Sequence, residues 1–443
     1  MTTKIFNPNA GIASRGKETA LIVLTGIFFF TFYLPGSPLI NNIAIVSLVI
    51  FCGFFNTGIE KLRLLRQRPA LLFIVLFYIL QILSLYLSRD KDRAWLYLQV
   101  RIPLLLFPIS LGLIYIRHAL KVRIYFVYAL ITTLAALVCL VSAMIIFNRT
   151  GDSGFIYNDS LSDAIGKQSV YFALMVNVAI FSYAYLAINN YLAPGFKKLA
   201  IFCIAFLMLI HFMLASRMEI VFLYTSAIVF ALYYFFIKKK NRKAGFIMIG
   251  ALVCCGIAFV QLFPKTLNRF NELVYPTYDF KSDAVESHYN MQLTPEQWNG
   301  LNIRLAIWNC GFEVVKRHPV MGVSIGDKDQ ALLDVFKEKE FKFGIRTNKN
   351  MHNTYLDILA SMGVVGLIVF LTGFIILPLK SCVRSRDLIG LLVIIDFILS
   401  FITETYPDRS MGCIIFSFFI AFIISTKDRE YLKTKNPMSV QSE

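Results

Sequence analysis

Long apolar runs separated by short charged clusters dominate the chain. A helix that crosses a membrane needs about 20 mostly apolar residues, and about twelve segments come close to that requirement. The predicted spans are 18–34, 40–57, 70–87, 98–116, 124–147, 168–192, 198–214, 218–237, 244–263, 352–379, 387–403 and 410–425. The pattern therefore predicts an all-α polytopic membrane protein with about twelve transmembrane helices.

The composition supports this fold class. Only 16% of the residues are charged and 57% are hydrophobic, whereas a soluble globular protein carries roughly a quarter charged residues. The eight cysteines have no metal-ligand spacing, and most lie in predicted spans, where cysteine packs as a small apolar residue. A soluble enzyme, a secreted disulfide scaffold and a disordered protein are excluded.

The net charge of +17 reflects the topology of the chain. The connections between predicted spans alternate along the chain. Every second connection is rich in Lys and Arg, and the other short connections contain few of them. Positive connections remain on the cytoplasmic side, so both termini are predicted to be cytoplasmic. This bias accounts for most of the positive charge, and no nucleic-acid partner is expected.

One outward connection is much longer than the others. Residues 264–351 are nearly neutral, and loops of this length are usually functional. A stripe of Leu301, Leu305, Trp308, Phe312 and Val315 predicts an amphipathic helix that packs on the membrane or the bundle, and a second helix is expected at 327–342. The predicted organisation is transmembrane helices over 1–263, a loop domain over 264–351, transmembrane helices over 352–425 and a cytoplasmic tail over 426–443.

Several polar residues that are distant in sequence share the outward side. His352 lies where the tenth span begins, and the dipole of that helix favours a neutral imidazole that can accept a proton. Arg217 and Arg304 suit an anionic ligand, because guanidinium groups bind phosphate oxygens bidentately. Each also has a structural alternative: His352 as an interfacial residue, Arg217 as a snorkelling side chain and Arg304 as part of a solvated helix face.

Weaker candidates surround these three residues. Asn353, Glu404, Arg409 and Arg101 are supporting positions on the outward side, although an arginine there can be an ordinary interfacial charge. Asp396 lies in the middle of a span with no basic partner in a neighbouring span, so a hydrogen bond to another helix and a mechanistic role are both open.

The motifs that carry these residues resemble a known family. The run LNIRLAIWNCGFEVVKRHPVMGVSIGD (301–327), followed by MHNTYLDILASMGVVG (351–366) and preceded by ASRMEI (215–220), is similar to the O-antigen ligase / O-antigen polymerase superfamily of bacterial envelope enzymes. Two positions depart from the family pattern. KQSVYF stands where relatives often have a histidine near the start of the sixth span, and GVSIGD lacks a middle glycine.

The resemblance implies glycosyl transfer at the periplasmic face of the bacterial inner membrane. The implied donor is a glycan on undecaprenyl diphosphate, and the implied acceptor of a ligase is lipid A-core. Ligases of this family are inverting and independent of metals, so no cofactor is expected. By position, His352 matches the proposed base, Arg217 and Arg304 match the diphosphate-binding arginines, and Glu404 matches an acidic residue near the last spans.

The sequence favours an O-antigen ligase among several related activities. An O-antigen polymerase and a protein O-oligosaccharyltransferase use the same lipid-linked donor and remain open alternatives. A flippase or transporter is less favoured, because such proteins usually show repeated halves and charges near the middle of the bilayer, whereas only Asp396 lies deep in a span here.

Overall fold

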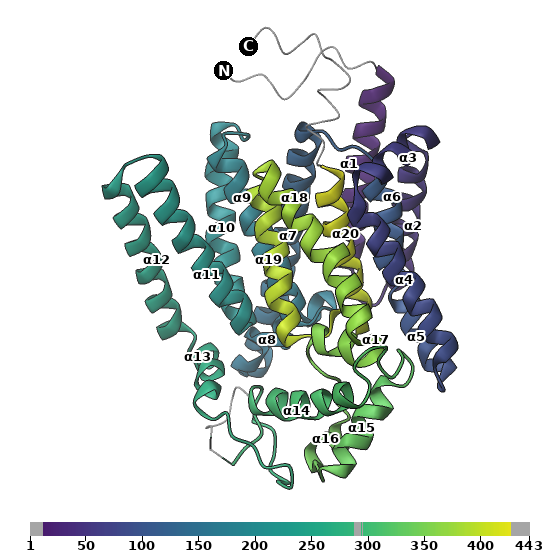
Figure 1. The fold of residues 1–443 in the computed structure, drawn as a ribbon. Coiled ribbons are helices and arrows are strands. Elements are labelled where there is room, and N and C mark those ends of the chain that lie inside the picture. The colour runs from purple at the N-terminus through teal and green to yellow at the C-terminus, as the bar shows by residue number, and fades with distance from the viewer. Residues whose placement is uncertain (1–11, 288–293, 295, 427–443) are drawn as a thin grey trace.

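The computed structural model describes residues 12–287, 294 and 296–426. Within these residues the chain is helical, and the single β-type contact is an isolated bridge between Glu286 and Trp298. Figure 1 shows an upright helical bundle with a smaller group of helices against one end. We call this group, formed by the described residues between α12 and α17, the loop unit.

The long helices of the bundle follow the apolar runs, and short polar helices connect some of them. The helices of the bundle are α1 (Ile12–Phe32), α2 (Pro38–Phe55), α3 (Gly58–Gln67), α4 (Pro69–Leu87), α5 (Lys91–Val100), α6 (Pro103–Ser110), α7 (His118–Thr150), α8 (Asn158–Ser162), α9 (Ser169–Ile188), α10 (Pro194–Leu214), α11 (Arg217–Ala231), α12 (Arg242–Leu262), α17 (Thr354–Phe370), α18 (Leu377–Ser385), α19 (Leu388–Thr403) and α20 (Ser410–Ser425). The loop unit contains α13 (Pro264–Asn271), α14 (Asn302–Arg317), α15 (Lys328–Glu338) and α16 (Lys342–Thr347). Short 3-10 or π-helical turns join several of these helices, among them η6 (Leu371–Ile376), which links α17 to α18, and η7 (Tyr406–Asp408).

All predicted spans are helical, which confirms an all-α polytopic membrane protein. In the described part of the chain, 9 helices are long and apolar enough to cross a membrane, and α1, α19 and α20 are not among them. Figure 1 shows α1 beginning and α20 ending at the end of the bundle opposite the loop unit. The predicted tail at 426–443 lies, beyond Thr426, outside the described residues.

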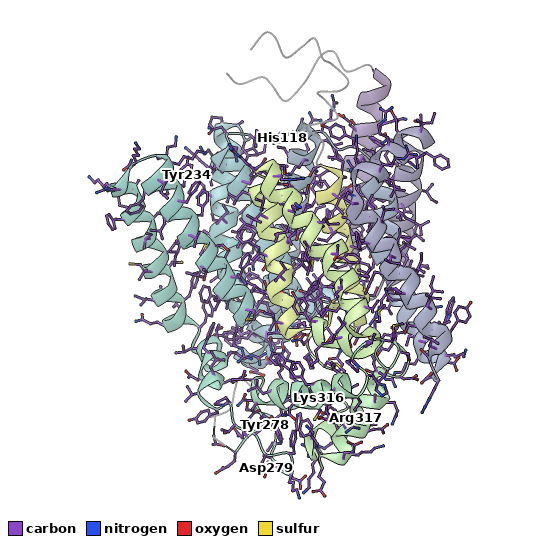
Figure 2. All side chains as sticks on the ribbon, viewed as in Figure 1. His118, Tyr234, Tyr278, Asp279, Lys316 and Arg317 are labelled. Carbon is purple, nitrogen blue, oxygen red and sulfur yellow. The ribbon has the colours of Figure 1, made fainter. Side chains whose placement is uncertain are left out.

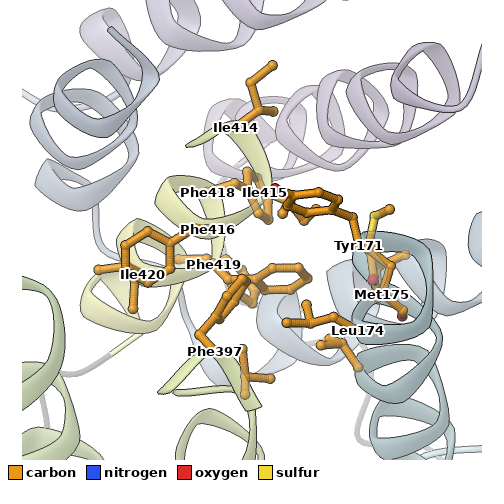
Figure 3. Close-up of a cluster of buried hydrophobic side chains, with 14 of the residues drawn as sticks. Tyr171, Leu174, Met175, Phe397, Ile414, Ile415, Phe416, Phe418, Phe419 and Ile420 are labelled. Carbon is orange, nitrogen blue, oxygen red and sulfur yellow. Dashed lines mark hydrogen bonds between the residues drawn. The ribbon is translucent and has the colours of Figure 1, made fainter. Parts of the chain in front are cut away.

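The centre of the bundle is built around α9 and α20. Almost every side chain of both helices is buried, and Figure 3 shows their aromatic and aliphatic side chains packed together with Phe397 of α19. A helix of 16 residues such as α20 is about 24 Å long, shorter than the roughly 30 Å hydrocarbon layer. Other helices surround α20, so its length need not match the lipid.

The loop unit is fixed to the bundle through its GVSIGD segment (322–327). The Asp327 carboxylate accepts hydrogen bonds from the backbone N–H groups of Arg89 (2.9 Å) and Asp90 (3.0 Å), at the start of α5. Gly326 lies so close to the Asp90 carbonyl that a side chain there would overlap it. The segment therefore holds the loop unit against the bundle, and its glycines serve close packing.

The prediction for the buried face of α14 was wrong. Its buried apolar positions are Ile303, Ala306, Ile307, Cys310 and Val314, which pack with α15 and α16 and also with Leu356 and Ala360 of α17 in the bundle. The predicted stripe is half-buried, and Phe312 is exposed. Both sides of this helix carry apolar residues, so periodicity alone selected the wrong one.

Candidate functional site

His352 lies in the bend directly before α17. Its backbone has φ 44°, a left-handed conformation that is uncommon for residues other than glycine. The bend is held because His352 N–H donates to Asn350 Oδ1 (3.2 Å) and Asn353 N–H donates to Thr405 Oγ1 (3.1 Å). Strained backbone of this kind is often found at functional sites.

Asn353 serves as the N-cap of α17. Its side-chain oxygen accepts a hydrogen bond from Leu356 N–H at 2.9 Å, which satisfies one of the unpaired donors of the first helical turn. His352 therefore precedes the helix instead of starting it, close to the positive end of the helix dipole.

Glu404 connects His352 to Arg304. Its Oε1 accepts from Arg304 Nη2 at 2.9 Å, and its Oε2 lies 3.5 Å from His352 Nδ1. Burial favours a higher pKa for the Glu404 carboxyl, but the contact with His352 and the charge of Arg304 outweigh it and hold the pKa below its usual value. Glu404 is therefore an anion shared between a guanidinium and an imidazole.

Arg304 is fixed by backbone carbonyls as well. It donates to the Thr403 carbonyl from Nε (3.1 Å) and to the Gly300 carbonyl from Nη1 (2.7 Å). These contacts join the start of α14 to the turn after α19. The guanidinium is oriented by three acceptors yet remains partly exposed, with a relative side-chain exposure of 21%.

The side chain of Arg217, from α11, lies close to Arg304. Its Nη1 donates to Glu272 Oε2 (3.0 Å) and to the Arg269 carbonyl (2.8 Å). Glu272 Oε2 also accepts from the backbone N–H of Gly300 at 3.1 Å. A Cβ atom at Gly300 would lie 3.1 Å from Arg217 and 3.4 Å from Arg304, so the two guanidinium groups flank this glycine.

The structure thus brings His352, Arg304 and Arg217 into one group, with Glu404 and Glu272 between them. Two of the contributing segments, those of Arg217 and Glu404, come from the bundle, and those of Glu272, Arg304 and His352 come from the loop unit, so the site forms where the two meet. Two cations, two carboxylates and an imidazole can together hold an anionic ligand and accept a proton. Among the described residues, no three His, Cys, Asp or Glu side chains are arranged to share a metal ion.

Arg101 belongs to a different group of charges. Its guanidinium is fully buried and contacts Asp408 (3.2 Å) and Asp357 (3.4 Å). Lys328 of α15 pairs with the same two carboxylates, at 2.6 Å from Asp408. We call these four residues the buried cluster. Arg101 was predicted to support the ligand site. The sequence did not predict that its guanidinium is buried and paired with two carboxylates.

The buried cluster and the site are linked by one side chain. Asn350 donates from Nδ2 to Asp408 Oδ2 at 3.3 Å, and its Oδ1 accepts the backbone N–H of His352. For Asp408, burial opposes ionisation, but the charges of Lys328 and Arg101 outweigh it and lower the pKa. The cluster therefore supports the bend that carries His352.

The remaining predicted candidates have separate positions. Arg409 is exposed at the start of α20, and none of the ion pairs recorded between described residues includes it. Asp396 is fully buried in α19, where Asn177 Nδ2 donates to its Oδ1 at 3.3 Å. The same amide nitrogen lies 2.9 Å from Glu219 of α11, so Asp396 takes part in a polar contact between helices.

Sequence reasoning missed Glu272 and Gly300. Glu272 is buried, and its pairing with Arg217 spans 55 positions of the chain. Neither residue lies in a recognisable motif. The signal that could have found Glu272 is its spacing from Arg269 on a short amphipathic segment just after a span.

Fold and geometry together define a polytopic membrane protein that groups two arginines, two carboxylates and a histidine at one end of its helical bundle. Residues 200–371 match the family model described as O-Antigen ligase, which confirms the predicted resemblance to that superfamily. The matched region contains Arg217, Arg304 and His352 but ends before Glu404 and Arg409. A comparison with curated proteins gives no match.

The match supports a function of the O-antigen ligase or polymerase type. In general terms, this is a membrane glycosyltransferase activity with a lipid-linked glycan and a lipid acceptor. The region that matches runs from α10 into η6 and includes the described part of the loop unit, where the site is assembled.

Proposed function

We propose that this protein is an O-antigen ligase that transfers a glycan en bloc from undecaprenyl diphosphate to lipid A-core at the periplasmic face of the inner membrane. The observation that carries the proposal is the contiguous row Arg304, Glu404 and His352 beside Arg217. It combines diphosphate-binding cations with a base, and these are the two elements that this reaction requires.

The donor diphosphate would bind to Arg217 and Arg304. Both arginines are already paired with carboxylates, but each guanidinium remains partly exposed, with relative side-chain exposures of 19% and 21%. A diphosphate carries more negative charge than one carboxylate and matches the guanidinium geometry. It would therefore compete with Glu272 and Glu404 for these arginines and place both cations beside the diphosphate oxygens.

The transfer would proceed as a single displacement. The acceptor hydroxyl oxygen attacks the anomeric carbon of the donor, and its proton passes to His352 Nε2, since Nδ1 faces Glu404. The bond between the anomeric carbon and the diphosphate oxygen breaks, and its electron pair remains on the diphosphate. Arg217 and Arg304 stabilise the charge that develops there. The product has the inverted anomeric configuration.

Glu404 would link diphosphate binding at Arg304 to protonation of His352. His352 Nδ1 is buried without a hydrogen-bond partner within bonding distance, and 3.5 Å from Glu404 is longer than a good hydrogen bond. When a diphosphate takes over Arg304, the carboxylate is released to move toward His352. Catalytic hydrogen bonds often tighten in this way once substrate binds, and the closer anion stabilises the imidazolium that forms.

A direct test is transfer by the purified protein in detergent. Undecaprenyl-diphosphate glycan and lipid A-core would be supplied with a metal chelator, using the wild type, His352→Ala and, as a matched control, His118→Ala. His118 lies at the opposite end of the bundle (Figure 2). We expect glycan-bearing lipid A-core from the wild type and His118→Ala but not from His352→Ala.

The identity of the product separates the related activities. Longer lipid-linked glycans without modified lipid A-core would contradict a ligase and identify a polymerase, whose acceptor is a second lipid-linked glycan. Glycan transferred only to an added protein would identify a protein O-oligosaccharyltransferase. Equal yields from wild type and His352→Ala would exclude His352 as the base.

A further inference from the structure

The transmembrane helix α17 is interrupted, and a segment of the loop unit fills the gap. Gly363 has φ 63° and ψ −168°, which is not helical. In an unbroken helix the N–H groups of Val364 and Val365 would donate four residues back, to Ala360 and Ser361. Here segment 319–324 supplies the partners instead. The four hydrogen bonds are Val364 N to Pro319 O (2.9 Å), Val365 N to Val320 O (3.4 Å), Val323 N to Ala360 O (2.9 Å) and Ser324 N to Ser361 O (2.9 Å).

Two glycines make this contact close. A side chain at Gly363 would overlap the carbonyl of Val320, and one at Gly322 would overlap the backbone of α17 at Ser361. Both glycines also have positive φ, which other residues adopt at a cost. The inserted segment is therefore in backbone-to-backbone contact with the helix.

The tip of this segment is apolar and exposed. Val320 is 61% exposed and Met321 57%. Both are large hydrophobic residues, and they lie beside an apolar transmembrane helix. Next to them on α17, Val364 and Ile368 are also exposed, as expected for the lipid-facing side of a span. The exposed tip therefore continues the apolar side of α17 that would face lipid.

The depth of the break places the tip at the edge of the hydrocarbon layer. At 1.5 Å per residue, Gly363 lies about 25 Å along the span from Lys380, the first cation at the other end of the helix. The hydrocarbon layer is about 30 Å thick. Lys316, just before the segment, is well exposed.

We propose that segment 318–322 is a membrane wedge, which inserts Val320 and Met321 among the acyl chains of the phospholipids on the loop-unit side. Since α14 ends at Arg317, the wedge would hold the helix that carries Arg304 at the level of the lipid head groups. This inference stands on the broken helix and does not depend on the proposed glycosyl transfer.

Lipid contact can be measured with fluorophores at single cysteines. Cys254 and Cys255 are the only cysteines that are not buried, so Cys254→Ser and Cys255→Ser provide the background. Met321→Cys and Val320→Cys would be labelled with a nitrobenzoxadiazole fluorophore in vesicles of phosphatidylethanolamine and phosphatidylglycerol. Ile368→Cys is the lipid-facing control, and Asp279→Cys, far from the bundle in Figure 2, is the aqueous control.

Nitroxides on the lipid acyl chains should quench positions 320 and 321 as strongly as 368 and several-fold more than 279. A water-soluble quencher should show the reverse order. Quenching at both wedge positions that resembles Asp279→Cys would overturn the proposal. Energy transfer between labels at 321 on different molecules, without quenching by lipid nitroxides, would show that a second copy covers the tip and would overturn it as well.

Discussion

The site and the buried cluster are built from similar charges, but they differ in access to solvent. In the site, Arg217, Arg304 and His352 have relative side-chain exposures of 19%, 21% and 27%. In the buried cluster, Arg101 and Lys328 are fully buried. Both groups lie at the same end of the molecule, and Asn350 joins them.

This difference indicates what each group can do. A buried ion pair whose partners are all satisfied offers no position for a ligand, and removing one partner leaves a costly uncompensated charge. A partly exposed arginine can exchange one anion for another. We infer that the buried cluster holds the loop unit in place and that the partly exposed arginines of the site are available for substrate.

The largest expected effect comes from breaking the buried cluster. Lys328→Met should lower the free energy of unfolding by about 3–5 kcal/mol, because it leaves two buried carboxylates with one cation. The midpoint of thermal unfolding in detergent measures this change. Lys337→Met, an exposed position on the same helix, should stay within about 0.5 kcal/mol of the wild type. Similar midpoints for both variants would contradict the structural role of the cluster.

Breaking an ion pair in the site should lower the transfer rate strongly and the thermal stability only slightly. Arg304→Gln should lower the transfer rate about 10²–10³-fold, because it removes a cation that stabilises the departing diphosphate. Thermal unfolding should change much less than for Lys328→Met. Arg304→Lys keeps the charge but loses the bidentate geometry, so it should recover only part of the rate. If Arg304→Gln lost as much stability as Lys328→Met, the proposed difference in role between the site and the buried cluster would be contradicted.

The stability of the protein should depend on pH through Asp408 of the buried cluster. Because the pKa of Asp408 is lowered in the folded protein, its contribution to stability is complete above the unfolded pKa of about 3.9. That contribution is lost as the pH falls through the folded pKa. Asp408→Asn should be less stable at neutral pH and show a shallower acid-induced decline. Parallel declines in thermal midpoint for both proteins would contradict this assignment.

The smallest expected effect is at Gly300. In Gly300→Ala the new methyl group would lie 2.9 Å from Glu272 and 3.1 Å from Arg217, so these flexible side chains must shift. Stability should change by less than about 1 kcal/mol, while KM for the donor rises and kcat changes little. Donor titrations in the transfer assay measure both constants. An unchanged KM would show that the space between the arginines does not receive the donor.

The sequence predicted the fold well because each span is recorded locally as an apolar run. It also selected Arg217, Arg304 and His352, which lie in motifs that resemble a family. It could not separate Arg101 from these residues, because the partners of Arg101 lie 256 and 307 positions away and pair with it only after folding. The buried face of α14 was missed for a related reason: its packing partners are in α15, α16 and α17.

The most direct test of the central claim is the single-turnover transfer rate of His352→Ala at saturating donor. If His352 is the base of an open site and Arg217 and Arg304 bind the diphosphate, the variant should retain donor affinity and transfer glycan about 10²–10⁴-fold more slowly than the wild type. A rate within about tenfold of the wild type, at equal donor occupancy, would contradict the account, because that difference is smaller than the loss of a general base produces.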